Sequence, residues 1–376
     1  MAKRLLLSSP HMSDEGCELY YIKDAFEKNW IAPLGENVNE FERTMTEYTS
    51  SPCAVALSSG TAAIHLAMIL AGVGAGDSVF CQSMTFSASV NPAVYLGAKP
   101  VFIDSERETW NIDPDALLRA IKEYDVPKAV VAVCLYGNPA KLGELTEICE
   151  KYGITLIEDA AEALGSEYGG RKCGTFGRYG ALSFNGNKII TTSGGGMLLC
   201  RDESDAKHAL KLATQAREPY PWYEHEEIGY NYRMSNICAG IGRGQAKVLP
   251  ERVKRKREIF ALYEELLSES GLKMQPSLDC AESNRWLSAA LIDEGRGITP
   301  DEVLARLDEN NIEGRRLWKP MHLQPVFRRM GAPYVTSAGE SVSDDLFSRG
   351  FCLPSDTKMT DDDVRRVCGV IGEMFA

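Results

Sequence analysis

The sequence predicts an α/β protein with a largely parallel central sheet, and three features lead to this prediction. Short apolar segments alternate with amphipathic ones up to about residue 245, as in proteins whose strands alternate with helices. Residues Ala129–Leu135 form a continuous apolar run, which is typical of a strand buried on both faces. The pattern then changes, so we expect a large domain over residues 1–245 and a smaller α/β domain over residues 246–376.

The predicted elements of the large domain follow one another in strand–helix order. Ser59–Leu70 is expected to be a helix, because a serine that can cap it precedes residues that fill an apolar face. Strands are expected at Ser78–Cys81 and Lys99–Asp104, and a helix near Asp113–Tyr124 carries proline just inside its start. The remaining elements are a helix at Leu142–Tyr152 and strands at Ile154–Ile157 and Gly180–Phe184.

We expect helices at both ends of the C-terminal part of the chain and a flexible N-terminal segment. The smaller domain is expected to open with one long helix over Val248–Ser268, which is amphipathic and highly charged. Residues 360–375 have the pattern of a capped helix that closes the chain. At the other end, we expect a flexible N-terminal segment attached to the large domain.

Composition and charge exclude several classes of protein. The net charge of −12, from 53 acidic and 41 basic residues, argues against a general binder of nucleic acid or anionic membranes. The eleven cysteines are scattered without a C-x-x-C pair, which favours reduced thiols in a cytosolic protein over a metal site or disulfide framework. No signal peptide opens the chain, and the longest apolar run, Ala129–Tyr136, is too short to span a membrane. We therefore predict a cytoplasmic protein with no metal, membrane or nucleic-acid partner.

A lysine in a tight turn is the first candidate for chemistry. The stretch SFNGNKIITTSGGG, residues 183–196, places Lys188 among glycine, asparagine and serine residues just after a predicted strand. A lysine on a loop is usually a solvated surface residue. A partly desolvated lysine, however, can form Schiff bases with carbonyl groups. Ser183, earlier in the same stretch, could hydrogen-bond a phosphate group.

The second candidate is Asp159, in the stretch TLIEDAAEALGS, residues 155–166. It ends an apolar strand, and in open α/β sheets ligands gather at the carboxyl ends of strands. A carboxylate at this place can pair with a cationic ring nitrogen. The alternative is that Asp159 only caps an alanine-rich helix predicted to follow it.

Two weaker signals lie earlier in the chain. Gly60 and Thr61 open a predicted helix whose free N–H groups could cradle a phosphate, although a simple capped helix start explains the same residues. Phe86, in MTFSAS at residues 84–89, offers a flat face to a planar cofactor, although such an aromatic residue usually belongs to the core. A phosphate cradle, a flat ring, a carboxylate and a lysine together describe a site for pyridoxal phosphate (PLP).

Longer motifs carry a resemblance to a known family. They are NWIAPLG (29–35), SSGTAAIHLA (58–67), GAKPVFID (97–104), IEDAAEALGS (157–166), LSFNGNKIITTSGGGML (182–198), GYNYRMSN (229–236), SNRWL (283–287) and LWKPMHLQPVF (317–327). With these motifs the chain resembles the DegT-type nucleotide-sugar aminotransferases. The resemblance implies the three-layer PLP-dependent transferase fold of aspartate aminotransferase (fold type I), with a mixed, mostly parallel central sheet and a smaller C-terminal α/β domain.

The resemblance implies roles for the residues around the cofactor. Lys188 forms the Schiff base and shuttles the proton, Asp159 pairs with the pyridine nitrogen, and Phe86 stacks on the ring. Glu162 falls near the ring oxygen O3′, where many relatives carry Gln or His, so the sequence departs from the family pattern there. A carboxylate beside a phenolate is unfavourable unless it is protonated or turned away.

The same resemblance assigns the cofactor phosphate and the assembly. Gly60, Thr61 and Ser183 hold the phosphate. Asn231, in the GYNYR segment, reaches the phosphate of the cofactor in the neighbouring subunit. The active unit is therefore expected to be a homodimer with shared active sites.

The motifs FNGNKIITTSGGG, SNRWL and LWKPMHLQP resemble one branch of the family more closely. That branch aminates UDP-4-keto-6-deoxy-N-acetylglucosamine in bacterial glycan synthesis, as in the bacillosamine pathway. The resemblance implies L-glutamate as the amino donor and pyridoxamine phosphate between the two half-reactions. The residues expected to contact the nucleotide sugar are Trp30, Arg233, Arg285, Trp318, Lys319 and His322.

Several alternatives remain open at this point. The sugar could instead be a dTDP- or GDP-linked 4-keto or 3-keto deoxysugar. An NAD-dependent oxidoreductase is disfavoured, because the glycines in Gly72–Asp77 follow a predicted helix and lack the third glycine of the dinucleotide motif. Relatives that dehydrate their sugar replace the lysine by histidine, and Lys188 argues against that reaction. The remaining alternative is a regulator that binds PLP or a sugar nucleotide without catalysis.

Overall fold

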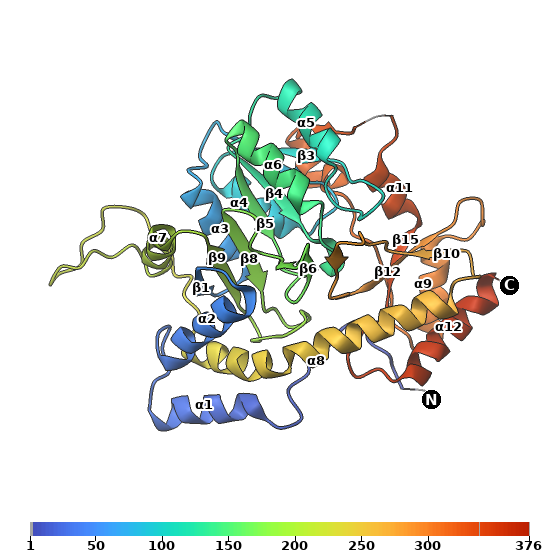
Figure 1. Cartoon of the computed structure of the whole chain (residues 1–376), viewed down its shortest axis with the longest axis horizontal. Coiled ribbons are helices and arrows are strands. Elements are labelled where there is room, and N and C mark those ends of the chain that lie inside the picture. Colours follow the sequence, from blue (N-terminus) through green and yellow to red (C-terminus); the bar gives the residue numbers. More distant parts are fainter. Residues whose placement is uncertain (1–2, 338, 376) are drawn as a thin grey trace.

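The computed structural model describes residues 3–337 and 339–375, and an eight-stranded sheet forms its centre (Figure 1). The strand order is β1-β9-β8-β5-β4-β2-β3-β14. Strand β9 runs antiparallel to both of its neighbours, while the other pairs are parallel. The sheet is thus mixed and mostly parallel, which confirms the predicted fold class.

The elements of the large unit have the following bounds. The strands are β1 (Cys53–Leu57), β2 (Ser78–Gln82), β3 (Lys99–Ile103), β4 (Ala129–Val133), β5 (Thr155–Asp159), β8 (Tyr179–Ser183), β9 (Gly196–Cys200) and β14 (Tyr334–Val335). The helices are α1 (Cys17–Glu27), α2 (Glu36–Thr49), α3 (Gly60–Leu70), α4 (Asn91–Tyr95), α5 (Pro114–Glu123), α6 (Leu142–Tyr152), α7 (Glu203–Ala213) and α10 (Pro325–Arg329). Single turns of 3₁₀-helix lie at η1 (Ser87–Ser89), η2 (Leu135–Gly137) and η3 (Met321–Leu323).

Two separate hydrophobic cores cover the two faces of this sheet. On one face, α3 and α7 contribute buried residues such as Leu66 and Leu212. On the other face, α2 and α6 contribute residues such as Phe41 and Leu145. All five residues of β4 are buried, as expected of a strand between two helical layers. The large unit therefore has three layers, helix on sheet on helix.

Most predicted elements of the large unit appear close to their predicted bounds. The side chain of Ser59 caps α3 by accepting a hydrogen bond from the N–H of Ala62, and Asp113 caps α5 by accepting one from Asp115. These local bonds satisfy N–H groups that a helix start leaves unpaired, and they explain why sequence alone located the two helices.

Helix α8 (Asn236–Leu266) begins twelve residues before the predicted start at Val248. Three glycines in this first part have low helix propensity, and they concealed the helix in the sequence. A Cβ on Gly242 would lie 2.7 Å from the ring of Phe41, and one on Gly244 would lie 2.5 Å from the backbone of Glu18. The glycines thus let α1 and α2 pack closely against α8, and this packing overrides propensity.

The smaller unit is built on the far half of α8, which runs from one unit into the other (Figure 1). Its sheet has the order β10-β12-β15-β13. The bounds are β10 (Leu272–Met274), β12 (Ser288–Ile292), β13 (Arg315–Arg316), β15 (Gly350–Leu353), α9 (Pro300–Glu309), α11 (Val342–Arg349) and α12 (Asp361–Phe375). A separate three-stranded sheet joins β11 (Ala281–Glu282) to β6 (Glu167–Tyr168) and β7 (Arg171–Lys172).

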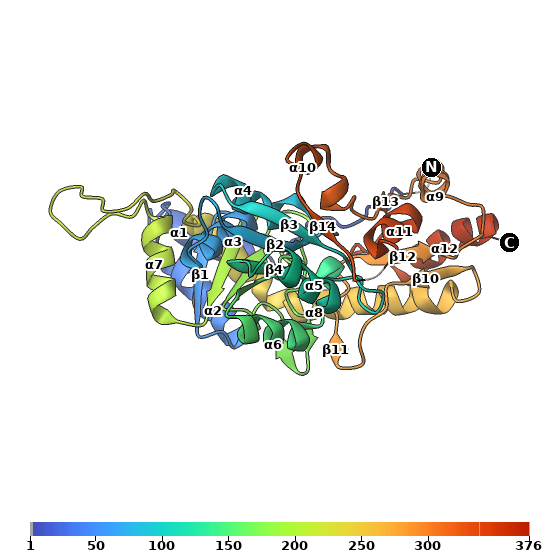
Figure 2. The same ribbon diagram turned by 90° about the horizontal axis from the view of Figure 1, so that it is seen from above.

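The chain crosses between the two units more than once. After β13 it returns to the large sheet, where β14 pairs with β3 and becomes the edge strand, and α10 lies beside it (Figure 2). At the other end, Leu5 is buried in the core of the smaller unit and forms a bridge with Ile312. The predicted flexible N-terminal segment is therefore packed against the rest of the chain from Leu5 onward. The division of the chain at residue 245 stays a prediction.

The described part of the chain contains no helix with the length and apolar character needed to cross a membrane.

Candidate active site

A cavity of about 430 Å³ opens at the carboxyl ends of the central strands, between the large sheet and the smaller unit. Its lining includes Leu7 from the N-terminal segment, Val133 from β4, and Leu287 and Cys352 from the smaller unit. The residues predicted from the sequence that line it are Gly60, Thr61, Phe86, Asp159, Glu162, Ser183, Lys188 and Trp318. The structure thus brings together segments that are far apart in the sequence.

Lys188 lies in the turn after β8, where its N–H donates to the carbonyl of Asn185 at 3.0 Å. Its side chain is only 13% exposed. The Nζ atom is 3.3 Å from Oε1 of Glu162 and 4.2 Å from the ring centroid of Trp286. An amine between a carboxylate and an aromatic face inside a cavity is not a solvated surface lysine.

Asp159 lies at the end of β5 and is 5% exposed. Its carboxylate accepts hydrogen bonds from the hydroxyl of Ser89 at 2.6 Å and from the N–H of Ala161 at 3.1 Å. Burial raises the pKa of Asp159, while these two bonds and the charge of Lys188 act to lower it. The residues that follow form turns rather than the expected alanine-rich helix, so Asp159 is not a helix cap.

The start of α3 forms a cradle at one side of the cavity. The first N–H groups of a helix have no partner within the helix and attract anions. Gly60 lies so close to Ser183 that an added Cβ would sit 3.1 Å from the Cβ of Ser183. A Cβ on Gly196 would lie 2.2 Å from the carbonyl carbon of Ser59, so β9 can come this close to the start of α3 only because residue 196 is glycine. The helix N–H groups and the Ser183 hydroxyl therefore face the same space.

Glu162 also lines the cavity and is buried. One carboxylate oxygen accepts the N–H of Tyr136 at 2.7 Å, and the other lies 3.3 Å from Nζ of Lys188. Burial raises the pKa of Glu162 to about 7, and the charge of Lys188 and the Tyr136 bond only partly oppose this rise.

The arrangement can be compared with known proteins. The model of the DegT/DnrJ/EryC1/StrS aminotransferase family matches residues 13–372. The chain belongs to this family. It is 52% identical, over its whole length and 97% of the relative, to EpsN of Bacillus subtilis (strain 168), which is named as a proposed pyridoxal phosphate-dependent aminotransferase. It is 33% identical to GDP-perosamine synthase of Vibrio cholerae, over 96% of this chain and 97% of that one.

Solved structures of the DegT/DnrJ/EryC1/StrS family share this fold. The aminotransferase TlmJ from Streptoalloteichus hindustanus superposes with a TM-score of 0.89 at 29% identity, over 99% of each chain. Relatives of this chain carry names for GDP-, dTDP- and UDP-linked sugars. As a member of the family, the chain is a PLP-dependent sugar aminotransferase.

The residues around the cavity fit the cofactor of this family. The cradle at Gly60, Thr61 and Ser183 suits a phosphate group, because it offers helix N–H groups and a hydroxyl. Asp159 offers a fixed carboxylate for the ring nitrogen, and Lys188 offers an amine in the same cavity. Phe86 lines the cavity and is 59% exposed, and its ring centroid lies 5.6 Å from that of Trp318.

Three residues predicted to contact the nucleotide sugar do not line this cavity. The Arg285 guanidinium stacks on Phe260 at 3.7 Å and donates to the carbonyl of Gln275, so packing occupies it. Burial lowers the pKa of Arg285 to about 10. The ring of His322 stacks on Tyr334, and its Nδ1 lies 2.7 Å from the hydroxyl of Ser83. Lys319 is exposed outside the cavity.

Three further predicted residues lie on another part of the large unit. Arg233 is buried in an ion pair with Glu42, and it also donates to the carbonyl of Ala56 at 3.0 Å. Trp30 is exposed beside the start of α8. Asn231 bridges to Thr214 at the base of the long segment between α7 and α8, which projects from the molecule in both views (Figures 1 and 2). Within one chain, none of these three lines the cavity.

The lining residues that sequence reasoning missed include Trp286, Arg315 and Arg316. Trp286 belongs to the SNRWL motif, in which its neighbour Arg285 was predicted to contact the substrate. Arg315 and Arg316 directly precede the LWKPMHLQP motif, and two adjacent arginines beside a family motif were the signal that could have found them. They bring two guanidinium groups to the cavity from the smaller unit, where Arg315 pairs with Glu313 at 3.0 Å and Arg316 with Asp301 at 3.1 Å.

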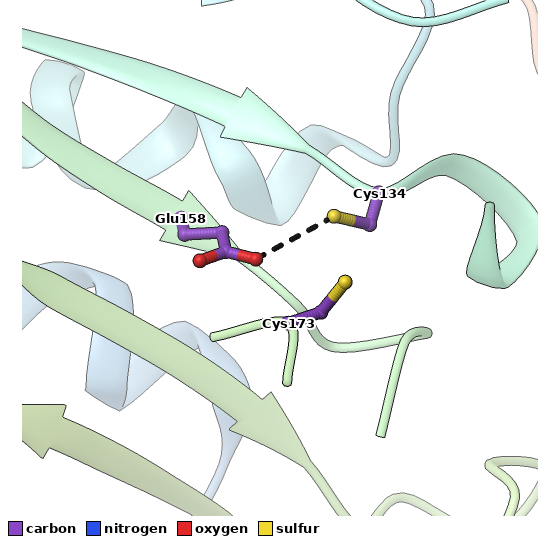
Figure 3. A group of neighbouring side chains, drawn as sticks. All are labelled: Cys134, Glu158 and Cys173. Carbon is purple, nitrogen blue, oxygen red and sulfur yellow. Dashed lines mark hydrogen bonds between the residues drawn. The ribbon is translucent and has the colours of Figure 1, made fainter. Parts of the chain in front are cut away.

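A second group of titratable side chains lies outside the cavity. The ligand atoms of Cys134, Glu158 and Cys173 lie within 4.8 Å of one another, and all three residues are buried (Figure 3). Glu158 already accepts hydrogen bonds from the N–H groups of Gly174 at 2.6 Å and Phe176 at 3.0 Å. These bonds direct Glu158 to the opposite face of β5 from Asp159.

A larger hollow of about 660 Å³ lies at the other end of the large sheet. Its basic residues include Arg171 and Arg178, and Arg178 pairs with Asp205. We place the active site in the smaller cavity, because it alone of the two contains Lys188 and Asp159.

Proposed function

We propose that this enzyme transfers an amino group from L-glutamate to C4 of a UDP-linked 4-keto-6-deoxy-N-acetylhexosamine. The product is a UDP-4-amino sugar of the bacillosamine type for bacterial glycan synthesis. The observation that carries the proposal is one cavity that unites Lys188, Asp159 and a phosphate cradle with Arg315 and Arg316 at its rim. The motifs that resemble the UDP-sugar branch support the choice of nucleotide.

The residues have distinct tasks in this reaction. When bound, PLP supplies an electron sink for the carbon that loses a proton. Lys188 takes up the Cα proton of the amino donor as general base. Asp159 keeps a proton on the ring nitrogen through its negative charge. The N–H groups at Gly60 and Thr61, with the Ser183 hydroxyl, anchor the phosphate end.

The substrate end of the cavity supports a nucleotide sugar. Arg315 is exposed and Arg316 is half-buried. One guanidinium group can donate two parallel hydrogen bonds to two oxygens of a phosphate. Trp286 and Trp318 add apolar walls to the same cavity, and Trp286 lies against Lys188. We infer that the diphosphate binds at Arg315 and Arg316, while the sugar ring lies against the tryptophans.

We infer that the active unit is a cytoplasmic homodimer. Exposed apolar residues on α1, among them Leu19, Tyr20 and Phe26, and in the projecting segment, among them Tyr223 and Ile228, support a covered face. A second chain would also bring its Asn231, Arg233 and Trp30 toward the shared sites. Co-expression of Lys188→Ala and Asn231→Ala chains should restore part of the activity, because one site of a mixed dimer carries neither change. Full activity of a monomer in sedimentation experiments contradicts this assembly.

The substrate proposal is tested with a panel of UDP-, dTDP- and GDP-linked 4-keto-6-deoxy sugars and L-glutamate. We expect the UDP sugar to give the highest kcat/KM, with the new amine and its configuration identified by NMR. A preference for a dTDP or GDP sugar would replace the nucleotide assignment but keep the reaction. Lack of turnover on every sugar, with the cofactor unchanged by glutamate, would favour a PLP-binding regulator.

A further inference from the structure

Glu162 is fixed in place at both its side chain and its backbone. Its Oε2 accepts the N–H of Tyr136 at 2.7 Å, and its own carbonyl accepts a hydrogen bond from Nδ2 of Asn284 at 2.8 Å. The same amide of Asn284 also donates to the carbonyl of Leu164 at 2.9 Å. With both ends held, the second carboxylate oxygen is directed at Lys188, 3.3 Å away.

The N–H donor for Glu162 comes from an unusual backbone. Tyr136 has φ of 56° and ψ of 21°, the left-handed region, although it is a bulky residue and fully buried. Such conformations persist only where the surroundings hold them, and they cluster at functional sites. Its hydroxyl accepts the N–H of Trp318 at 2.9 Å, which ties this turn to the smaller unit.

We propose that Glu162 is a positioning residue that holds the amine of Lys188 whenever that amine is not joined to the cofactor. The inference rests on the proposed role of Lys188 as general base. After Lys188 takes up a proton, it carries a positive charge on a side chain that is only 13% exposed. The Glu162 carboxylate on one side and the Trp286 ring on the other stabilise that charge and keep the amine in reach of the donor carbon.

The groups around Glu162 agree with this role. The titratable side chains that face it are Lys188, Asp159, Tyr136 and Cys352. Among these four, Lys188 is the one that can carry a positive charge. A glutamine at this position would keep the hydrogen bond from Tyr136 but could not balance an ammonium.

The first test is a double-mutant cycle on the full chain with its cofactor removed. Lys188→Met and Glu162→Gln are made singly and together, and urea unfolding measures their stabilities at pH 8.5, where the Glu162 carboxyl group is ionised. We expect Lys188→Met to cost less stability in the Glu162→Gln background than in the wild type, because the pair is already broken. Glu158→Gln is the matched control, since Glu158 is buried on the same segment but faces away, and its effect should add to that of Lys188→Met. Additive effects for Glu162 as well would overturn the inference.

The second test follows the first half-reaction in the holoenzyme by the visible absorbance of bound cofactor. With L-glutamate alone, Glu162→Gln should lower the maximal rate by up to about 10²-fold, the low end for acid–base contributions. The donor concentration at half-maximal rate should stay unchanged, and Glu162→Asp should recover part of the rate. A weaker donor affinity at full rate would overturn the inference. If the wild type itself does not react with L-glutamate, the proposed donor fails, while the mutant cycle still decides the Glu162–Lys188 pair.

Discussion

Lys188 and Lys256 contact the same tryptophan, Trp286, but they lie in different chemical surroundings. Lys188 lies over the indole ring and beside a carboxylate. Lys256, on α8, is 2% exposed, and its amine donates to the carbonyl of Trp286 at 2.8 Å and to the hydroxyl of Ser8 at 3.1 Å. Burial lowers the pKa of Lys256 to about 7.

The difference shows that burial alone does not make a lysine catalytic. The partners of Lys256 are neutral oxygens, so its amine can give up its proton and remain hydrogen-bonded. It joins α8 to the N-terminal segment and to the residue that lies under Lys188. Lys188 instead faces an open cavity and a counter-charge, and both are needed by a group that gains and loses protons during a reaction. The following predictions test this contrast.

The largest expected effect on turnover comes from replacing each of the two lysines by alanine. Lys188→Ala should fold and lose turnover by roughly 10²–10⁴-fold or more, because it removes a general base. Lys256→Ala should keep measurable turnover and lose stability instead. Steady-state kinetics and urea unfolding of both variants check this. Near wild-type transamination by Lys188→Ala would break the comparison.

Asp159→Asn should have the next largest effect on the Lys188 side. The substitution keeps the shape but removes the charge that holds a proton on the ring nitrogen, so proton abstraction should slow by roughly 10²-fold. The measurement is the single-turnover rate with L-glutamate at full cofactor occupancy, verified by absorbance. Unchanged kinetics with cofactor fully bound would count against the role of Asp159.

Lys256→Met should change how stability depends on pH. Between pH 7 and 10.5 the unfolded chain binds a proton that the folded chain lacks, so this lysine makes stability rise with pH across that window. The shift corresponds to on the order of 5 kcal/mol at most. Asp356 and Arg252 also act on Lys256, and they remain in the variant. Urea unfolding at several pH values should show a flatter alkaline curve for Lys256→Met.

Glu162→Gln should also change how the stability of the cofactor-free protein depends on pH, with a sign opposite to that of Lys256. Between pH 4.5 and 7 the folded chain holds a proton on Glu162 that the unfolded chain has lost, so this group makes stability fall as pH rises. The contribution is on the order of 3 kcal/mol. The difference between variant and wild type in urea unfolding measures it, and a difference independent of pH would contradict the raised pKa.

The smallest expected effect is that of Ser8→Ala. It removes one of the two partners of Lys256 and should cost about 1 kcal/mol, the usual net value of one hydrogen bond. Combined with Lys256→Met, the change should cost less than it does alone, because its partner is then absent. Differential scanning calorimetry suffices to detect both effects.

The contrast also shows what could be predicted from the sequence. The strands that lead to Asp159 and Lys188 could be predicted because apolar runs and turn residues are local signals. Both residues were therefore placed correctly after the ends of strands. Glu162 was noticed only as a departure from the family pattern, and its contact with Lys188 was not predicted. That contact depends on the N–H of Tyr136, which holds the Glu162 carboxylate in place. Local pattern carries no information about such a contact.

The failures have a common physical cause. Arg285 was expected to contact the nucleotide sugar because it belongs to the SNRWL motif, but stacking on Phe260 occupies it. Trp286, Arg315 and Arg316 were missed because the smaller unit brings them to the cavity through tertiary packing. The first third of α8 was missed because its glycines serve contacts with α1 and α2. In each case, residues distant in sequence decide the outcome.

The return of the chain to the large sheet through β14 has a practical consequence. A break between residues 245 and 246 would leave β14, which completes the edge of the large sheet, on the second fragment. The same break would leave Leu5, which fills the core of the smaller unit, on the first fragment. Each half would thus hold a piece of the other, and neither would fold on its own. The break would also divide α8 at Gln245, whose side chain donates to the carbonyl of His11, so we expect a chain divided there to lose its activity.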